Sequence, residues 1–383
     1  MDNFSCVMKG NSNCVKSNDF FYVIFFTIIS FGKSIGFDNN NNIFIFMSIL
    51  AFIFLFFQLL IYKYKISDIF KIVLLSMLGL IVYLKSGEIT VLASIITIVL
   101  CKTINISKLI RIVFWAKSFG FLSTISMSIL GILQNKYYIK IIDGSEKIIN
   151  RYCLGYSHPN IAFMNFFILV VLFIYLKGEK IKAMNYLLII CMSILMYKFT
   201  YSRTGLICVF ITIIFSVFIN KFDLESHKFV KKLIICMPII SGVGSVLVSY
   251  WYNPMNKIMC LINNGLTGRM ELGNRFLSMY KLKMFGQKII ESSNLNGAYL
   301  RIDNGYISLL LVYGIASFIL FILTEVLLIK KFIIKKRYNE VLLIIMFLIY
   351  GISENYIYNV FINISLLFAS ELLFSKKGIV NKN

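Results

Sequence analysis

The sequence predicts an all-α polytopic membrane protein with about twelve transmembrane helices. Of its 383 residues, 59% are hydrophobic and only three are proline, and the mean hydropathy is +0.82, so the chain is far more apolar than a soluble domain. Uninterrupted apolar runs of sixteen residues or more recur along it, and about 20 helical residues cross a bilayer core. Continuous apolar runs predict helices, because the strands of an outer-membrane barrel alternate polar and apolar residues.

The expected spans form one transmembrane domain, 19–374, between cytoplasmic tails at 1–18 and 375–383. The polar N-terminus has no small-residue cleavage site before the first apolar run, so we expect an uncleaved first span. The third and fourth spans are short; they either cross with little tilt or form a re-entrant pair. The twelve expected spans are 19–37, 43–62, 69–84, 88–104, 112–133, 160–176, 184–201, 204–220, 233–252, 304–329, 341–356 and 357–374.

The distribution of basic residues predicts that both termini are cytoplasmic. The inner loops and tails hold 23 of the 39 Lys and Arg residues, whereas the three short outer loops hold two. This asymmetry follows the positive-inside rule and explains the net charge of +22 without nucleic acid as a partner. Two longer outer segments, 134–158 and the large loop 253–303 between the ninth and tenth spans, are exceptions, and we expect them to carry the function.

The cysteines and the isolated charges inside the spans do not predict a metal centre. The eight Cys are scattered, mostly within apolar runs, without CxxC or Cys/His spacing. We therefore expect no disulfide framework, no metal site and no cofactor. Lys117, Glu325 and Glu371 lie near inner span ends, where we expect them to snorkel or to be paired.

Arginines are concentrated on the outer side. Five of the seven Arg lie there, but only ten of the thirty-two Lys, and a planar guanidinium is the group best suited to phosphate or carboxylate recognition. Side chains from different spans at one membrane face can build a shared site. The four outer clusters are Arg151 with His158 and Asn160; "YSRTG" at 201–205; Arg269, Arg275 and Arg301 leading to "RIDNGY" at 301–306; and "SENY" at 353–356.

Each cluster also has a structural alternative. A residue before proline is typical of a helix start, and hydroxyl and amide side chains are typical helix caps. The alternatives are a helix start at His158 and Pro159, a cap by Ser202 with Arg203 reaching lipid headgroups, a cap by Asp303–Asn304, and a solvated rather than catalytic Glu354.

Taken together, the clusters favour chemistry on a diphosphate. Several Arg without clustered carboxylates suggest that guanidinium groups, not Mg²⁺, neutralise the phosphates. A nearby carboxylate or histidine can remove a proton from a hydroxyl. Such a set fits glycosyl transfer from a lipid-linked diphosphate sugar, although composition alone fits an anion transporter equally.

At these residues the sequence resembles the Wzy-type polysaccharide polymerases of bacteria, within the O-antigen ligase/polymerase superfamily. The resemblance covers about 150–360, and the first 150 residues match only as hydrophobic spans. The matching pieces are "RYCLGYSHPN" (151–160), "YSRTGL" (201–206), "TGRMELGNRFLSMYKLKMFGQ" (267–287), "DNGYISLLLVYGI" (303–315) and "GISENYIYN" (351–359).

The resemblance implies a metal-independent glycosyltransferase in the bacterial cytoplasmic membrane, with its site facing outward. Its substrates would be undecaprenyl-diphosphate-linked oligosaccharides in the lipid bilayer, with a chain-length regulator and a flippase as further partners. Arg203, Arg269 and Arg151 would bind the diphosphates. Asp303 would be the base, with His158 as the competing choice. The remaining residues implied in substrate binding are Asn160, Arg275, Arg301, Asn304, Tyr306 and Glu354.

Two neighbouring functions stay open. The ligase branch of the superfamily usually has His where this chain has Asp303, which favours a polymerase. A flippase or exporter of the same lipid would show charged residues through the depth of several spans and two comparable halves. For a polymerase we expect Arg203→Lys and Arg269→Ala to stop chain growth with folding intact. O-antigen, capsule and exopolysaccharide are not distinguished.

Overall fold

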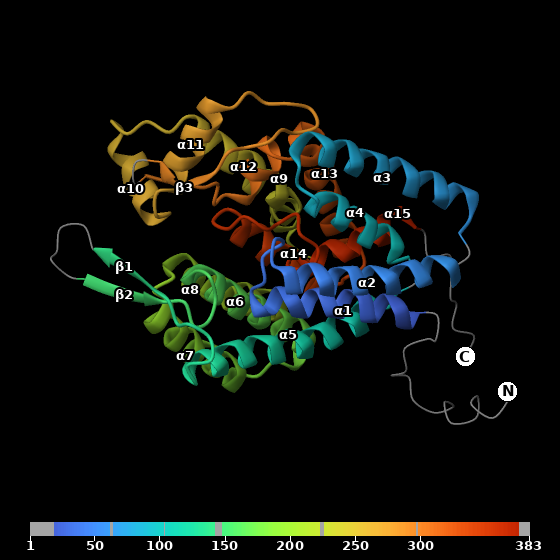
Figure 1. The fold of residues 1–383 in the computed structure, drawn as a ribbon, viewed down its shortest axis with the longest axis horizontal. Helices are drawn as coiled ribbons and strands as arrows, with labels where there is room; N and C mark the ends of the chain where they lie inside the picture. Colours follow the sequence, from blue (N-terminus) through green and yellow to red (C-terminus); the bar gives the residue numbers. More distant parts are fainter. Residues whose placement is uncertain are drawn as a thin grey trace.

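The computed structural model is an elongated bundle of helices with connecting segments at both ends, and the longest of them lie at one end (Figure 1). The structure describes residues 19–61, 64–102, 104–141, 148–222, 226–295 and 298–374, so the expected tails lie outside the described residues. Helices α1, α2, α3 and α5 run along the long axis, and the hairpin β1–β2 lies at the same end as α10 and α11. We call this end, which also carries the turn 352–363, the loop end. The bounds of these elements are α1 Phe20–Ile35, α2 Asn42–Ile61, α3 Ile66–Ser86, α5 Ile106–Ile129, α10 Lys257–Gly265, α11 Arg269–Met279, β1 Tyr137–Ile141 and β2 Ile148–Tyr152.

The prediction of a helical membrane protein is supported at the level of helix length and composition. Among the described residues, seven helices are long and apolar enough to cross a membrane: α2, α3, α5, α6 (Pro159–Lys177), α7 (Ala183–Thr200), α8 (Arg203–Lys221) and α9 (Lys228–Tyr250). Among the remaining elements α13 (Gly314–Ile334) is also long, with 21 residues, but it contains the three charged residues Glu325, Lys330 and Lys331; the others are shorter. These others are α4 (Thr90–Leu100), α12 (Gly305–Leu311), α14 (Tyr338–Gly351), α15 (Ser370–Leu373), the 3-10 turns η2 (Gly178–Lys180) and η3 (Ile364–Ala369), and the strands β3 (Ser292–Leu295) and β4 (Ala298–Leu300).

The third and fourth expected spans form an unequal hairpin. Helix α3 has 21 residues and α4 only 11, and at 1.5 Å per residue α4 is about 16 Å long. Lys102, two residues beyond α4, nevertheless forms an ion pair with Asp68 in the first turn of α3. The chain after α4 therefore returns to the end of the bundle at which α3 began.

The expected last span, 357–374, is not a regular helix. From Ile357 to the start of η3 the chain is irregular, because asparagine side chains compete with the helical backbone bonds. Asn363 Nδ2 donates to the Ile357 carbonyl over 2.8 Å, and its Oδ1 accepts from Ser365 over 2.6 Å. Irregular backbone at membrane depth is tolerated only where protein surrounds it, and every residue of this segment is buried or partly buried.

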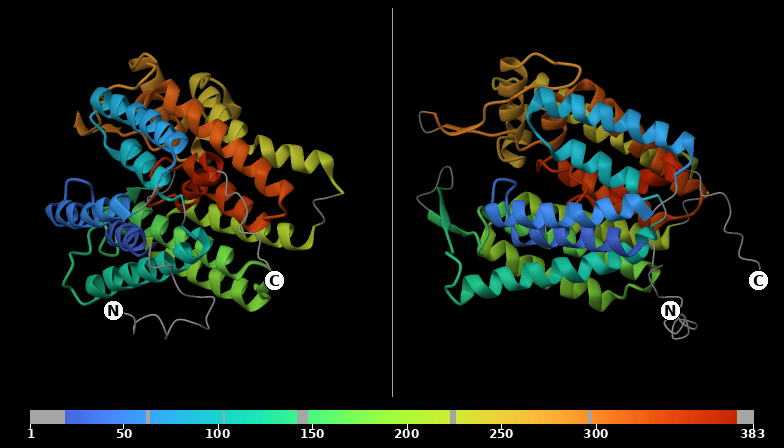
Figure 2. Two further views of the ribbon diagram at one scale, coloured as in Figure 1. Left: turned by 90° about the vertical axis from the view of Figure 1, so that its right-hand side faces the viewer. Right: turned by 45° about the vertical axis from the view of Figure 1, so that its right-hand side comes forward.

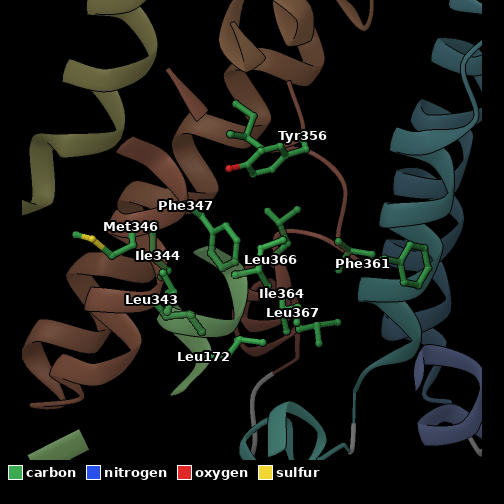
Figure 3. Packing of buried hydrophobic residues seen from close by; sticks show 14 of the residues in the cluster. Leu172, Leu343, Ile344, Met346, Phe347, Tyr356, Phe361, Ile364, Leu366 and Leu367 are labelled. Carbon is green, nitrogen blue, oxygen red and sulfur yellow. The ribbon is translucent and has the colours of Figure 1, made fainter. Parts of the chain in front are cut away.

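Helices α6 and α14 occupy the centre of the bundle. Within the apolar window of α6, 72% of residues are buried, against 17% for α3, and α14 packs against α6, α8, α9 and α13. Figure 3 shows Phe347 of α14 directed toward Ile364 and Leu366 of the irregular last segment. On the other side of that segment, Phe361 packs against Phe26 of α1 with ring centroids 5.3 Å apart. The last segment thus joins the two sides of the core.

Two of the three isolated charges inside the spans do not have the surroundings that the sequence predicted. Glu371 pairs as expected, with Arg337 at 2.9 Å. Lys117 is 2% exposed and donates to the Ser30 carbonyl over 3.3 Å, so it neither snorkels nor pairs with a carboxylate. Glu325 is 1% exposed, and within the described part of the chain neither carboxyl oxygen has a hydrogen-bond partner.

Glu371 is paired, whereas Glu325 has no hydrogen-bond partner in the described part of the chain. We therefore expect opposite effects on stability when the carboxyl group of each residue is removed. Glu325→Leu is expected to raise the unfolding temperature of the purified protein, because a buried polar group without a partner costs about 1–3 kcal/mol. Glu371→Leu, the matched control, is expected to lower it because Arg337 would lose a partner. Thermal unfolding in detergent measures both, and a Glu325→Leu protein no more stable than wild type would contradict the expectation.

Candidate functional site

A continuous chain of polar side chains crosses the loop end. Arg151, on β2, donates from Nε to the Thr200 carbonyl over 3.0 Å and from Nη2 to Asn160 Oδ1 over 2.6 Å. Asn160, in the first turn of α6, donates from Nδ2 to Glu354 Oε1 over 3.3 Å. The same oxygen accepts from Arg269 Nη2 over 3.1 Å. Four of the predicted site residues, from three segments distant in sequence, are therefore brought together.

Arg269 is the most firmly fixed of these groups. It is the first residue of α11 and is 5% exposed. Its Nε donates to the Ser353 carbonyl over 2.6 Å, and Nη1 donates to the Leu266 carbonyl over 3.2 Å and to the Thr267 hydroxyl. Together with the ion pair to Glu354, these bonds hold the turn 352–363 against the start of α11.

Two adjoining cavities open beside this chain. The smaller one, of about 240 Å³, is lined among others by His158, Asn160, Asp303 and Glu354. The larger one, of about 750 Å³, extends toward the α3–α4 turn and α12. Both are lined by Lys33, Asp38, Glu291, Arg301, Asn355 and Tyr356. The two hollows therefore form one polar region with charges of both signs.

His158 is held as a neutral imidazole at the start of α6. Burial lowers its pKa to about 4, and the positive charges of Arg151, Arg301 and Arg269 lower it in the same direction. Its Nδ1 accepts the backbone N–H of Asn160 over 3.2 Å, which makes it the cap of α6 as the structural alternative predicted. A neutral ring that accepts at Nδ1 carries its proton at Nε2. His158 can thus donate a hydrogen bond to a ligand but is poorly placed to act as the base.

Glu354 is not solvated, contrary to the sequence-based expectation. Its side chain is 14% exposed and is paired with Arg269. Burial raises its pKa to about 7; Arg269 opposes that shift, Asp303 adds to it, and Arg151 opposes it. Because a general base works best when its pKa is close to the operating pH, Glu354 joins Asp303 as a candidate for this role. The hairpin lacks Lys and Arg in sequence, so only the tertiary contact with Arg269 reveals the pairing.

Arg203 does not join Arg269 beside Asp303, and the expected pairing of these two guanidinium groups is corrected. Arg203 begins α8 and is exposed, with its Cζ 5.5 Å from the centre of the Tyr201 ring. It lies three residues after Thr200, whose carbonyl accepts from Arg151. The α7–α8 turn therefore places Arg203 at the rim of the polar chain, close along the backbone to Thr200.

Two other arginines differ sharply in their surroundings. Arg275 lies on an exposed face of α11, in an i,i+4 ion pair with Glu271 at 2.6 Å and 52% exposed, so a substrate-binding role for it is not supported. Arg301 is 64% exposed, lies 3.5 Å from Glu291, and lines both cavities. Arg301 therefore belongs to the lining of the polar region, and its role in substrate binding stays a prediction.

Asn304 and Tyr306 have structural roles instead of the expected substrate contacts. Asn304 caps α12 by accepting from the backbone N–H groups of Tyr306 and Ile307 over 2.9 and 3.2 Å, so the capping alternative is confirmed for this residue. Tyr306 is completely buried, and its hydroxyl donates to the Leu348 carbonyl over 2.8 Å. With no exposed atom, Tyr306 cannot orient a substrate; both residues fix Asp303 at the start of α12.

The site also contains charges that sequence reasoning missed. Lys33, near the end of α1, donates to Asn39 Oδ1 over 2.7 Å and lines both cavities. Glu291 accepts from the backbone N–H of Ile302 over 3.0 Å, and burial raises the pKa of its carboxyl group. Lys33 lies outside the region of family resemblance; the only signal for it in the sequence is a lysine at the outer end of an apolar run.

No known protein identifies the site. Comparisons of the chain with models of protein families, with curated proteins and with solved structures find no match. Within the described ranges no group of three His, Cys, Asp or Glu side chains is arranged to hold a metal ion. The function is therefore argued from the geometry of the polar region and from the resemblance in the sequence.

Proposed function

We propose that the protein is a glycosyltransferase that lengthens polysaccharide at the outer face of the bacterial cytoplasmic membrane, using undecaprenyl-diphosphate-linked oligosaccharides. One observation carries the proposal: Asp303, Glu354 and Arg301 line one cavity at the end of an apolar helical bundle. Two further guanidinium groups are bonded to the lining of this cavity, Arg151 to Asn160 and Arg269 to Glu354. The combination of carboxylates with positive charge fits transfer of a sugar chain from a diphosphate.

The proposed reaction is a displacement at the sugar carbon bonded to the diphosphate. A hydroxyl of the acceptor unit attacks that carbon, the bond from carbon to the diphosphate oxygen breaks, and undecaprenyl diphosphate leaves with the bonding electrons. The hydroxyl proton passes to a carboxylate, for which Asp303 and Glu354 are the two candidates in the cavity. The product is a chain longer by one unit, and no nucleotide sugar is consumed.

The positively charged side chains would have different roles in the proposed reaction. Arg301, which lines both cavities and is largely exposed, would contact the diphosphate together with Lys33. Such fixed positive groups stabilise the charge that builds on the leaving diphosphate. Arg269 would act as a positioning residue, because its hydrogen-bonding groups are engaged by Ser353, Glu354 and the chain before α11. Arg203 would contact the phosphates only at the rim of the polar chain.

Transport of the same lipid-linked unit is the second candidate function. The observation that favours it is the burial of Lys117 and Glu325 inside the bundle, at 2% and 1% exposure, because buried charges in membrane helices often mark transport pathways. Neither residue, however, lines the polar region. The concentration of charges at the loop end therefore favours the transferase.

A strain that lacks the gene separates these functions. For the transferase we expect single lipid-linked repeat units to replace the ladder of long chains on a gel, with the units in the outer leaflet. Reintroducing the wild-type gene restores the ladder. Persistence of long chains in the deletion strain would refute the proposal, and accumulation of the units in the inner leaflet would identify a transporter instead.

A further inference from the structure

An apolar slot lies between the α3–α4 hairpin and α13, below the polar region. Helix α3 packs mainly against α4, and α4 also packs against η3 and α15; Figure 2 shows the hairpin beside α13. The space between them is about 140 Å³ and is lined chiefly by aliphatic side chains, among them Leu78, Ile95, Leu320 and Leu366. Apolar cavities of about this size stay dry and accept apolar ligands.

Tyr358 lies between the slot and the larger cavity of the polar region. It lines both the slot and the larger cavity, and its hydroxyl donates to Asn355 Oδ1 over 2.6 Å and lies 3.1 Å from Ser308 Oγ. Its backbone carbonyl accepts from Ser94 of α4 over 2.8 Å. The hydroxyl of Tyr358 therefore borders the larger cavity, whereas the side chains that surround Tyr358 in the slot are chiefly aliphatic. A molecule occupying both spaces must have a charged head and an apolar chain.

We propose that the slot binds part of the isoprenoid chain of a polyprenyl diphosphate whose diphosphate group lies in the larger cavity beside Lys33 and Arg301. The identity of the head rests on the proposed function. The location of the chain rests on the slot and the larger cavity being neighbours that share Tyr358 in their linings. Between membrane helices there is no hydrophobic driving force to close such a gap, since lipid chains are as apolar as leucine. The hairpin can thus remain apart from α13 and admit the chain from the bilayer.

The test uses a polyprenyl diphosphate that carries a diazirine along its chain, with the full-length protein in lipid nanodiscs. After illumination we expect labelled peptides from α4 and α13, and we expect unlabelled polyprenyl diphosphate to compete. Leu320→Trp fills the slot and should weaken binding by about tenfold, which corresponds to the usual cost of overpacking. Leu323→Trp is the matched control, because Leu323 is on the same helix but 55% exposed and does not line the slot.

The outcomes separate this inference from the proposed function. Unchanged labelling in Leu320→Trp, or labelling confined to α2, would refute binding of the chain in the slot. If Leu320→Trp does not assemble, Thr324→Trp, at another point of the slot lining, repeats the test. Labelling by a diazirine phosphatidylglycerol without competition from polyprenyl diphosphate would identify an ordinary bilayer lipid and also refute it. Specific binding by a protein that supports no chain growth would retain the slot and overturn the transferase.

Discussion

Arg269→Lys is expected to reduce chain growth by about 10²-fold, because a displacement of about 1 Å at a catalytic group can cost this much in rate. A lysine ammonium is a point donor and cannot reproduce the planar fork that joins the Ser353 carbonyl to Glu354 Oε1. The turn that carries Glu354 would then lose its fixed position at the start of α11. The measurement is the length of the glycan ladder made by membranes that contain equal amounts of each protein.

Three comparison variants make this prediction specific. Arg269→Ala should also lower the unfolding temperature, because it leaves the largely buried Glu354 without its cation; the sequence alone had suggested intact folding. Arg275→Lys should leave the ladder unchanged, because Arg275 is in an exposed pair on the same helix. Arg203→Lys should weaken substrate affinity without altering stability, because Arg203 is exposed at the rim. A normal ladder from Arg269→Lys would remove the positioning role.

The rate of chain growth is expected to rise with pH through a midpoint near 7 if Glu354 is the base. The pKa of this carboxyl group is raised to about 7 from an ordinary value of 4.5, so the group is protonated and inactive below the midpoint and ionised above it. His158, with a pKa lowered to about 4, stays neutral throughout this range and adds no step. Chain growth by reconstituted protein, measured from pH 5.5 to 8.5, gives the profile.

Isosteric amides assign the step to one of the two carboxylates. Glu354→Gln should abolish the rise near pH 7. Asp303→Asn should lower the rate, keep the rise and move its midpoint to lower pH, because the Asp303 charge helps to raise the pKa of Glu354. The reverse pattern would make Asp303 the base. Stability gives an independent readout: the folded state holds the Glu354 proton more tightly than the unfolded chain, so unfolding free energy should fall as pH rises from 4.5 through 7. Glu354→Gln should remove that slope.

The predictability of the fold differed between its elements for a physical reason. Long apolar runs such as those of α2, α6 and α9 can be predicted from the sequence, because length and hydropathy alone determine whether a helix suits a bilayer. The segment 357–374 has the same hydropathy signal, yet Asn359 and Asn363 divert its backbone bonds and the surrounding helices bury the irregular chain. A hydropathy pattern cannot separate a lipid-facing helix from an irregular segment enclosed by protein.

The candidate site shows the same division. The sequence by itself determined that this is an apolar helical chain with arginines gathered on a few interhelical segments, because composition and spacing are local properties. Only the tertiary structure decided which groups meet: Arg269 reaches Glu354, Lys33 enters from α1, and Arg203 stays at the rim. These contacts join residues far apart along the chain, and burial, pairing and the resulting pKa values exist only once the helices have packed.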